Sequence, residues 1–369
     1  MRTLPLRDIL AHKGAVFQER YGVQVPVTFN DFETEYRLIR DKVGITDFSY
    51  MQKFRISADA GLDFLDNLFV GNVAKTRFCR VLHTFLADPE GDLIADCYVA
   101  NNDEDFIILC ESIVDDQALK EVFNKNQSAQ AGLQDLTDTH VLISIDGYKA
   151  WAVVKELFGT DVLGLPYLSI ETYPFEGKNI SLLRAGKTSE FGYMIMAPKE
   201  LGPGLIKVLL DTAQKNEGGI CGVKVHDALR LEGRFFNIFA EGARVRDPLT
   251  LGLQWMIDFD KEAFIGRDPI LRKRQQGLQN KIIGIKADPC ASAFIPGAEL
   301  FSEGKKVAIV EASCFSCTLD SRLGLAVFPV DIAYAGLKFN LGKPEGERVE
   351  SISMPPIVPK SLSVKLDEL

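Results

Sequence analysis

The chain has 369 residues, of which 46% are hydrophobic and 25% charged, and its formal net charge at pH 7 is −9. This composition is typical of a globular protein with more than one hydrophobic core. The longest basic run, Arg272 to Arg274, is too short for a nucleic-acid-binding surface, and no window approaches the ~20 apolar residues that a membrane span needs. We therefore expect no nucleic-acid partner, no membrane partner and a cytoplasmic location.

The first part of the chain predicts alternating helices and strands. In residues 4–51 we expect a helix, a turn, a short strand and a second helix, because apolar residues recur near a 3.6-residue period from Phe32 to Val43. Residues 54–69 predict a strand followed by an amphipathic helix. Two hairpin strands, a charged helix at residues 112–126 and a polar linker come next.

A second region of mixed helices and strands begins at residue 140. Its expected elements are strands at 140–145, 180–186 and 188–198 and helices at 145–159 and 201–216. From Met256 onward the pattern changes to short strands separated by Gly and Pro turns, which is typical of a separate β-rich module. The expected fold class is therefore α+β with a β-rich C-terminal module.

Asp96 lies in the middle of a predicted strand that follows a Pro-Glu-Gly turn. Asp is depleted in strands, and a buried carboxylate is costly unless another group pairs with it or uses it. Either the alternation of the strand turns Asp96 to solvent, or the carboxylate points into a cavity and holds a cationic or N–H-bearing ligand. Spacing alone leaves both interpretations open.

Two further segments carry candidate functional residues. Glu190 follows a turn and begins a predicted strand, so it is either a solvated turn residue or a second inward carboxylate. His226, Arg230 and Arg234 recur at four-residue steps on one face of a predicted helix. A single His in such a helix is more often satisfied by a backbone carbonyl than used as a base or ligand.

The seven cysteines are scattered and odd in number, which predicts free thiols in a reducing compartment. Cys314 and Cys317 have metal or redox spacing, but the four histidines lie far away in sequence and no second pair is present, so we expect no metal site. A Gly-rich phosphate loop, a Gly-x-Ser-x-Gly elbow and a His-Glu-x-x-His motif are absent from the sequence. Nucleotide hydrolysis, serine esterase and zinc protease activities therefore lack support.

Several motifs resemble those of one family when they are taken in order. They are VGITDFSYM for GLFDVSHM, PEGDLIADCYV for GGxxDDLxVY, TSEFGYMI for TGExGxEI, VHDALRLEG for ARDxLRLEAG, a segment ending in FIGRDPIL for FIGRExL, and ISMPPIVP for KMPFVP. The chain is thereby identified as a divergent member of the aminomethyltransferase family, the T-protein of the glycine cleavage system together with related tetrahydrofolate-dependent demethylases. The resemblance extends from about Leu4 to Pro359.

The resemblance implies a three-domain cloverleaf around a central folate cavity, with the pterin inward and the glutamate tail outward. It implies an α+β folate-binding domain formed by residues 1–49 and 141–257. An inserted α+β domain, residues 50–140, carries Asp96. Residues 258–369 are expected to form a β-rich, barrel-like C-terminal domain.

The same resemblance assigns roles to individual residues. Asp96 matches the carboxylate beside the pterin where one-carbon transfer occurs, and Glu190 matches a pterin-contacting glutamate. Glu111 stands where the family usually has a pterin-contacting Asn, and His226 and Arg230 occupy the two basic positions of ARDxLRLEAG. These five residues are the expected folate-binding set, and Asp96 is the expected catalytic residue.

The departures from the family pattern bear on specificity. They are Ala95 for the first Asp of the pair, Glu111 for Asn, His226 for Arg, Ile238 near the usual Tyr and Tyr50 for His. An Asn-to-Glu change adds an acceptor that is charged when ionised, and an Arg-to-His change replaces a permanent cation with a group that titrates near neutrality. If both side chains face the cavity, we expect weaker pterin binding or a cationic donor.

The expected function is that of a tetrahydrofolate-dependent one-carbon transferase that moves a methyl or methylene group from a small methylated or aminomethyl donor to tetrahydrofolate. One alternative is a glycine cleavage T-protein that acts with a lipoyl carrier protein. The other is a folate-binding paralogue without turnover. The sequence does not name the donor.

Overall fold

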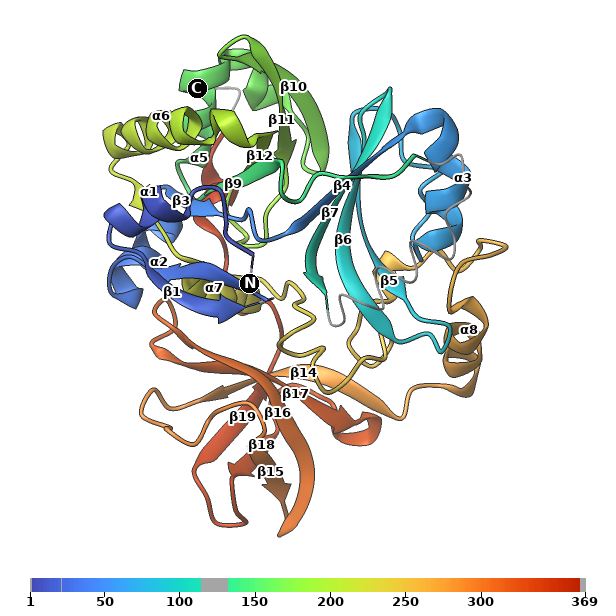
Figure 1. The fold of residues 1–369 in the computed structure, drawn as a ribbon. Coiled ribbons are helices and arrows are strands. Elements are labelled where there is room, and N and C mark those ends of the chain that lie inside the picture. Colours follow the sequence, from blue (N-terminus) through green and yellow to red (C-terminus); the bar gives the residue numbers. More distant parts are fainter. Residues whose placement is uncertain (1, 21, 114–131, 366–369) are drawn as a thin grey trace.

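The computed structural model describes residues 2–20, 22–113 and 132–365, which form three lobes (Figure 1). Within these residues, one sheet of eleven strands runs through the first two lobes, and a closed six-stranded barrel forms the third. The predicted α+β class with a β-rich C-terminal barrel is confirmed. The charged helix predicted at 112–126 lies almost wholly outside the described residues.

The first lobe begins with a helix and a hairpin that precede the main sheet. Its opening elements are α1 (Arg7–His12), β1 (Val16–Arg20), β2 (Val23–Thr28), α2 (Phe32–Asp41) and β3 (Gly44–Asp47). Helix α2 begins at Asp31, whose side chain accepts a 2.9 Å hydrogen bond from the backbone N–H of Thr34 and so satisfies one of the free amides of the first turn. The last turn of α2 carries Arg40 into the protein interior.

The second lobe consists of a curled part of the sheet with a helix on its outer face. Its elements are β4 (Gln52–Ser57), α3 (Ala58–Leu68), β5 (Arg80–Ala87), β6 (Leu93–Asn101), β7 (Asp105–Ile113) and β8 (Gln134–Asp135). The two-residue period of the strands separates two cores. Val99 and Cys110 pack with the buried side of α3, whereas Tyr98 and Leu109 face the inner side of the curled sheet.

The chain then returns to the first lobe. The elements there are β9 (His140–Asp146), α5 (Ala150–Phe158), η1 (Thr160–Gly164), β10 (Ser169–Phe175), β11 (Lys178–Arg184), β12 (Gly192–Pro198), η2 (Lys199–Leu201), α6 (Gly202–Lys215), β13 (Gly219–Ile220) and α7 (Val223–Glu232). Strand β10 was not expected from the sequence. The strand expected at 188–198 corresponds to β12, which begins only at Gly192, because Ser189 has a φ of 68° and interrupts the extended backbone. Residues 185–191 therefore form a loop, which we call the Lys187 loop.

The two sheet lobes meet at a narrow seam. The strand order is β13-β3-β9-β12-β11-β10-β5-β6-β7-β4-β8, and the register between β10 and β5 consists of Ser169 opposite Arg80. The Lys187 loop belongs to the first lobe and Asp96 on β6 to the second. Contact between Lys187 and Asp96 therefore joins the two lobes at this seam.

The barrel closes the third side of the molecule (Figure 1). After η3 (Gln254–Met256) and α8 (Arg267–Gln276), it is formed by β14 (Asn280–Ala287), β15 (Glu299–Ser302), β16 (Lys305–Ser316), β17 (Ser321–Pro329), β18 (Lys338–Leu341) and β19 (Arg348–Ile352), with η4 (Val330–Ile332) between β17 and β18. One hydrophobic cluster contains Phe85 of β5, Leu231 of α7 and Leu325 of β17, so it spans all three lobes. After the barrel, η5 (Lys360–Ser363) returns to the first lobe and packs near Glu190. The domain boundaries at 49/50, 140/141 and 257/258 remain a prediction.

Candidate functional site

Two adjoining cavities lie between the lobes. The inner cavity is lined by residues that include Tyr50, Tyr98, Glu111, Asp146, Lys187 and His226, and its volume is about 30 Å³. The outer cavity extends to the barrel, is lined by residues that include Phe239, Arg244, Pro296 and Glu311, and has a volume of about 510 Å³. Both share the lining residues Arg20, Asp227, Arg230 and Asn237, so the two cavities are contiguous.

Asp96 lies below the floor of the inner cavity and is 1% exposed. Its Oδ1 atom lies 2.8 Å from Nε2 of His83 on the neighbouring strand. The His83 ring stacks on Tyr98 with 4.6 Å between ring centroids, and Trp255 packs edge-on against its other side at 5.7 Å. Asp96 is not among the described residues that line either cavity. The expected catalytic carboxylate is therefore buried behind other side chains.

Lys187 is the side chain that separates Asp96 from the inner cavity. Its Nζ lies 2.5 Å from Oδ2 of Asp96 and also forms an ion pair with Glu111. A third oxygen, the backbone carbonyl of Phe236, accepts a hydrogen bond from Nζ at 3.2 Å. The residue is 8% exposed. A single buried cation thus binds two carboxylates from adjacent strands.

The alternation of β7 explains why Glu111 takes part in this cluster. Leu109 faces the inner side of the curled sheet and Cys110 faces α3, so the next residue, Glu111, faces the inner side again. Its carboxylate reaches Lys187 there. A β-bulge lies at the same place, because Asp96 is opposite Ser112 and Cys97 is opposite Cys110.

The ion pairs dominate the protonation of this cluster. Burial by itself raises the pKa of Asp96, but the charge of Lys187 and the contact with His83 outweigh it, and the pKa lies well below its usual value. Burial lowers the pKa of Lys187, but the two carboxylates raise it above its usual value. The pKa of Glu111 is raised, chiefly by burial and also by repulsion from Asp96, although Lys187 opposes this. Asp96 and Lys187 are therefore both charged near neutral pH.

Asp146 is a further carboxyl group on the inner cavity, at the end of β9. It accepts hydrogen bonds from the Ser144 hydroxyl and, at 3.5 Å, from the Thr188 hydroxyl. Burial raises its pKa to about 7, because these two hydroxyl groups compensate only in part for the lost hydration. Asp146 therefore changes charge near neutral pH.

The hydroxyl group of Tyr98 is unusual for a buried polar group. Tyr98 is 1% exposed and lines the inner cavity, and within the described part of the chain its hydroxyl has no hydrogen-bond partner. Buried polar groups are nearly always satisfied, and an unmade hydrogen bond costs about 1–3 kcal/mol. A polar ligand in the inner cavity would provide the missing partner.

His226 and Arg230 lie one helical turn apart on α7 and line the inner cavity. The Nε2 atom of His226 is 2.9 Å from the Thr46 hydroxyl, and burial lowers the pKa of His226 to about 3. The expectation that His226 titrates near neutrality is therefore wrong, and the imidazole is uncharged. Arg230 forms an ion pair with Glu241 at 3.0 Å and donates a hydrogen bond to the Phe235 carbonyl.

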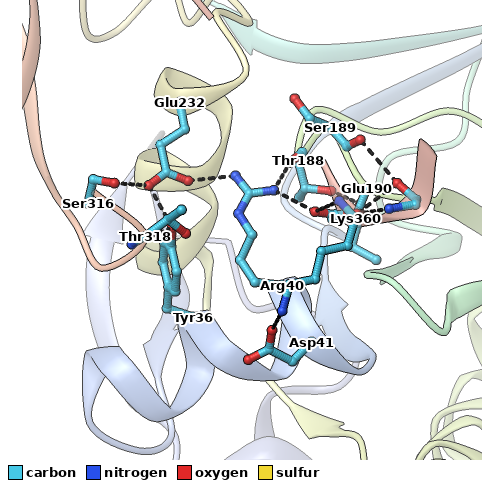
Figure 2. A network of polar contacts seen from close by, with 12 residues as sticks. Tyr36, Arg40, Asp41, Thr188, Ser189, Glu190, Glu232, Ser316, Thr318 and Lys360 are labelled. Carbon is cyan, nitrogen blue, oxygen red and sulfur yellow. Dashed lines mark hydrogen bonds and ion pairs between the residues drawn. The ribbon is translucent and has the colours of Figure 1, made fainter. Parts of the chain in front are cut away.

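Glu190 lies apart from the cavities and belongs to a second buried network (Figure 2). Its Oε1 atom is 3.2 Å from Nη1 of Arg40, and it accepts hydrogen bonds from the backbone amides of Lys360 and Ser361. Nη2 of Arg40 binds Glu232 at 2.6 Å. The predicted contact of Glu190 with folate therefore has no support in this placement.

The Arg40 network also holds the Lys187 loop. Nη1 of Arg40 donates a 2.6 Å hydrogen bond to the carbonyl of Thr188, the residue after Lys187. Glu232 in turn accepts hydrogen bonds from Tyr36 and Ser316, which connects the loop to α2 and to the barrel strand β16. Three distant parts of the chain thus fix the backbone beside the site (Figure 2).

Sequence reasoning placed Asp96, Glu111, His226 and Arg230 in one region, and the structure brings these four together. It missed Lys187 and Asp146. Each carried a signal, because Lys187 is a charged residue next to an apolar strand and a Gly, and Asp146 ends the buried run VLISI much as Asp96 interrupts another. Neither signal identifies the partner, since Lys187 meets carboxylates far away in sequence.

The described residues include no group of three or more His, Cys, Asp or Glu side chains that could hold a metal ion. Cys314 and Cys317 are free thiols, and burial raises the pKa of Cys317 to about 11. Nor do the described residues include a helix that is long and apolar enough to cross a membrane. The predictions on nucleic acid and cellular location remain predictions.

The lobes and the cavities define a class of proteins in which a curled sheet and a closed barrel enclose two adjoining cavities. Residues 6–261 match the GCVT N-terminal domain family, and the chain belongs to this family. The predicted membership of the aminomethyltransferase family, a family of one-carbon transferase enzymes, is confirmed. The general chemistry of the family is folate-dependent one-carbon transfer, with tetrahydrofolate as a substrate.

The individual relatives are distant but match over nearly their whole length. The chain is 25% identical to an aminomethyltransferase of Thermoanaerobacter sp. (strain X514) over 341 residues, 91% of each chain. It is 26% identical to one of Caldanaerobacter subterraneus over 339 residues, 91% of this chain and 89% of the relative. The crystal structure of glycine cleavage system aminomethyltransferase T from Bartonella henselae superposes with a TM-score of 0.83 at 20% identity, covering 97% of this chain and 98% of that one. That structural likeness shows a shared fold.

Proposed function

We propose that the chain is a tetrahydrofolate-dependent transferase that accepts a methyl or methylene group from a small methylated or aminomethyl donor. The observation that carries the proposal is the contiguous pair of cavities, whose lining includes Lys187, the ion-pair partner of Asp96, and other polar groups that a ligand could contact. The outer cavity lies within the size range of small-ligand sites. The polar groups of the inner cavity would fix the orientation of the ligand.

The residues that line the cavities fit tetrahydrofolate in chemical kind. The edge of a pterin ring carries N–H donors, and the carboxyl oxygens of Asp146 and Glu111 are acceptors. Apolar side chains beside them, among them Phe48 and Met194, suit the faces of the ring. The tail of the molecule is anionic, and the arginines of the outer cavity, including Arg244, suit carboxylates.

Tetrahydrofolate supplies the nitrogen atoms that accept the one-carbon group. Asp96 would stabilise positive charge that develops near those atoms, because a carboxylate in a water-poor site interacts strongly with charge. His83 orients the carboxylate through the 2.8 Å contact with Oδ1. Lys187 neutralises Asp96 in the conformation described, so this action requires that the ion pair open.

The proposal also specifies the kind of molecule that donates the one-carbon group. The outer cavity opens beside Arg20, Asp227 and Glu311, a mixed set of charges that suits a small zwitterionic or polar donor. The solved relative is titled a glycine cleavage system protein, and a lipoyl carrier protein as partner is the alternative. Stimulation of turnover by a lipoylated carrier would favour that alternative over a free small molecule.

A second function, folate binding without turnover, is favoured by one specific observation. Lys187 pairs with the carboxylate of Asp96, which lines neither cavity, so Asp96 is not available to a ligand in this conformation. A chain in which this pair never opens would bind in the outer cavity and leave the ligand unchanged. Folate binding with no turnover of any methylated or aminomethyl compound would select this function.

The test is the substitution Asp96→Asn, with tetrahydrofolate binding measured by calorimetry and one-carbon transfer by formation of methyl- or methylenetetrahydrofolate. We expect turnover to fall by about 10²-fold or more while binding persists, because loss of one preorganised electrostatic group has an effect of that size. Asp105→Asn is a matched control on the adjacent strand, where the carboxylate pairs with Arg55 at 3.0 Å. Wild-type turnover in a folded Asp96→Asn protein would rule out this mechanism.

A further inference from the structure

The ammonium group of Lys187 is engaged by oxygen atoms from three parts of the chain. Nζ donates hydrogen bonds to Asp96 on β6 and to the backbone carbonyl of Phe236. It also forms an ion pair with Glu111 on β7. A ligand that takes the place of Lys187 on Asp96 must therefore break these interactions.

The inner cavity is small while Lys187 is in this position. Its volume is about 30 Å³, whereas that of the outer cavity is about 510 Å³. The polar groups suited to a pterin edge, such as Asp146 and the Tyr98 hydroxyl, line the small cavity. The space and the recognition groups are thus separated, with the Lys187 side chain between the cavity and Asp96.

The backbone of the Lys187 loop is fixed, so only the side chain is free to move. Arg40 binds the Thr188 carbonyl at 2.6 Å, and the Thr188 hydroxyl contacts Asp146. On the other side, Gly186 packs so closely that an added Cβ would lie 2.9 Å from Oδ1 of Asp146. The four-carbon stem of a lysine, in contrast, turns about several single bonds.

We propose that Lys187 is a specificity-determining residue that occupies the one-carbon site, and that tetrahydrofolate reaches Asp96 only in molecules in which the Lys187 side chain has withdrawn. This inference rests on the proposed function. In this proposal the ion pair of Glu111 with Lys187 helps to determine whether Lys187 stays on Asp96 or withdraws. Withdrawal frees both carboxylates at the same time as it makes room for the ring.

Linkage gives the expected size of the effect. When the binding-competent state is a minor one, the apparent affinity falls by its fractional population. If Lys187 is paired with Asp96 in about 90% of molecules or more, removal of its side chain tightens tetrahydrofolate binding by about tenfold or more. We therefore expect Lys187→Ala to bind tetrahydrofolate about tenfold more tightly than wild type. Glu111→Gln removes one ion-pair partner of Lys187, and its affinity should lie between those of Lys187→Ala and wild type.

The wild-type chain provides a test that does not depend on the folding of a variant. Acetylation by N-hydroxysuccinimidyl acetate, read by peptide mass spectrometry, reports whether an amine is accessible. We expect Lys187 to be protected in the free protein and acetylated in the presence of saturating tetrahydrofolate. Lys261, which is 5% exposed and bonded to the carbonyls of Phe69 and Gly71, is the control and stays protected in both states.

The outcomes separate this inference from the proposed function. The proposed role of Lys187 is wrong if tetrahydrofolate binds tightly while Lys187 stays protected from acetylation. It is also wrong if Lys187→Ala and Glu111→Gln bind tetrahydrofolate no better than wild type. Both results leave the proposed one-carbon transferase function intact. Tetrahydrofolate binding by Lys187→Ala but not by wild type supports the proposal that the Lys187 side chain occupies the site. Absence of tetrahydrofolate binding in wild type and in both variants overturns the proposed function and this inference together.

Discussion

In two buried clusters of the described residues one cation is shared by two carboxylates, and the clusters differ in what surrounds them. Arg40 binds Glu190 and Glu232, and backbone amides, hydroxyl groups and a carbonyl complete the network (Figure 2). Lys187 binds Asp96 and Glu111 at the edge of a cavity. The first cluster has no adjoining cavity among those described, whereas the second has one.

The choice of cation agrees with this difference. A guanidinium group presents a rigid fork that suits several fixed acceptors at once, whereas an ammonium group is a compact charge on a flexible stem. Arg40 connects α2, the Lys187 loop and α7, and through Glu232 it reaches the barrel. A similar set of charges therefore supports the fold in one place and occupies the site in the other.

Breaking the Arg40 cluster should have the largest effect. Arg40→Met leaves the buried carboxylates of Glu190 and Glu232 without their cation, and we expect a loss of about 3–5 kcal/mol in the free energy of unfolding. Denaturant titration measures it. The control is Arg37→Met, because the pair of Arg37 with Glu33 is exposed to solvent and should contribute little to stability. Equal losses in the two variants would contradict a scaffold role for Arg40.

The second prediction concerns the inner cavity and the dependence of stability on the titration of Asp146. Asp146 has no cationic partner as strong as Lys187, the partner of Asp96. Burial raises its pKa to about 7 in the folded chain, whereas the unfolded value is near 3.8. The folded state thus keeps a proton that the unfolded state loses, so the stability that wild type draws from this group falls as the pH rises through that window and is lost above about 7.

Asp146→Asn removes this titration. The difference in unfolding free energy between variant and wild type should shift in favour of the variant by about 2–4 kcal/mol between about pH 4 and about pH 8, because each unit of pKa shift corresponds to about 1.4 kcal/mol. Urea titrations at several pH values measure it. The other titratable and charged groups around the cavity are present in both proteins, so the comparison isolates Asp146 together with its interactions with them; they are Tyr98, Glu111, Tyr167, Lys187, Cys221 and His226. A constant difference across the range would show that Asp146 does not titrate there.

Tyr98→Phe should have the smallest effect on stability and a clear effect on binding. Loss of a hydroxyl that has no partner within the described residues should leave the free protein unchanged or stabilise it by about 1 kcal/mol. If a ligand completes that hydrogen bond, tetrahydrofolate affinity should fall by about fivefold to tenfold. The matched control is Tyr193→Phe, since its buried hydroxyl also lacks a partner there but does not line either cavity. Equal affinity in both variants would mean that the ligand does not reach Tyr98.

The sequence by itself determined most of the helices and strands, the β-rich C-terminal module, the family and the position of Asp96 in a strand. These depend on local periodicity and on motifs, which are read along the chain. It also indicated Glu111, His226 and Arg230, all of which line the inner cavity.

Only the tertiary structure decided how these groups are used. The pairing of β6 with β7 brings Glu111 near Asp96, and a contact across 91 positions in sequence brings Lys187 onto Asp96. The turn at Ser189 sends Glu190 to Arg40 instead of the cavity. Charge, burial and room in a site depend on residues that meet only after folding, because desolvation and Coulomb interactions act through space and not along the chain.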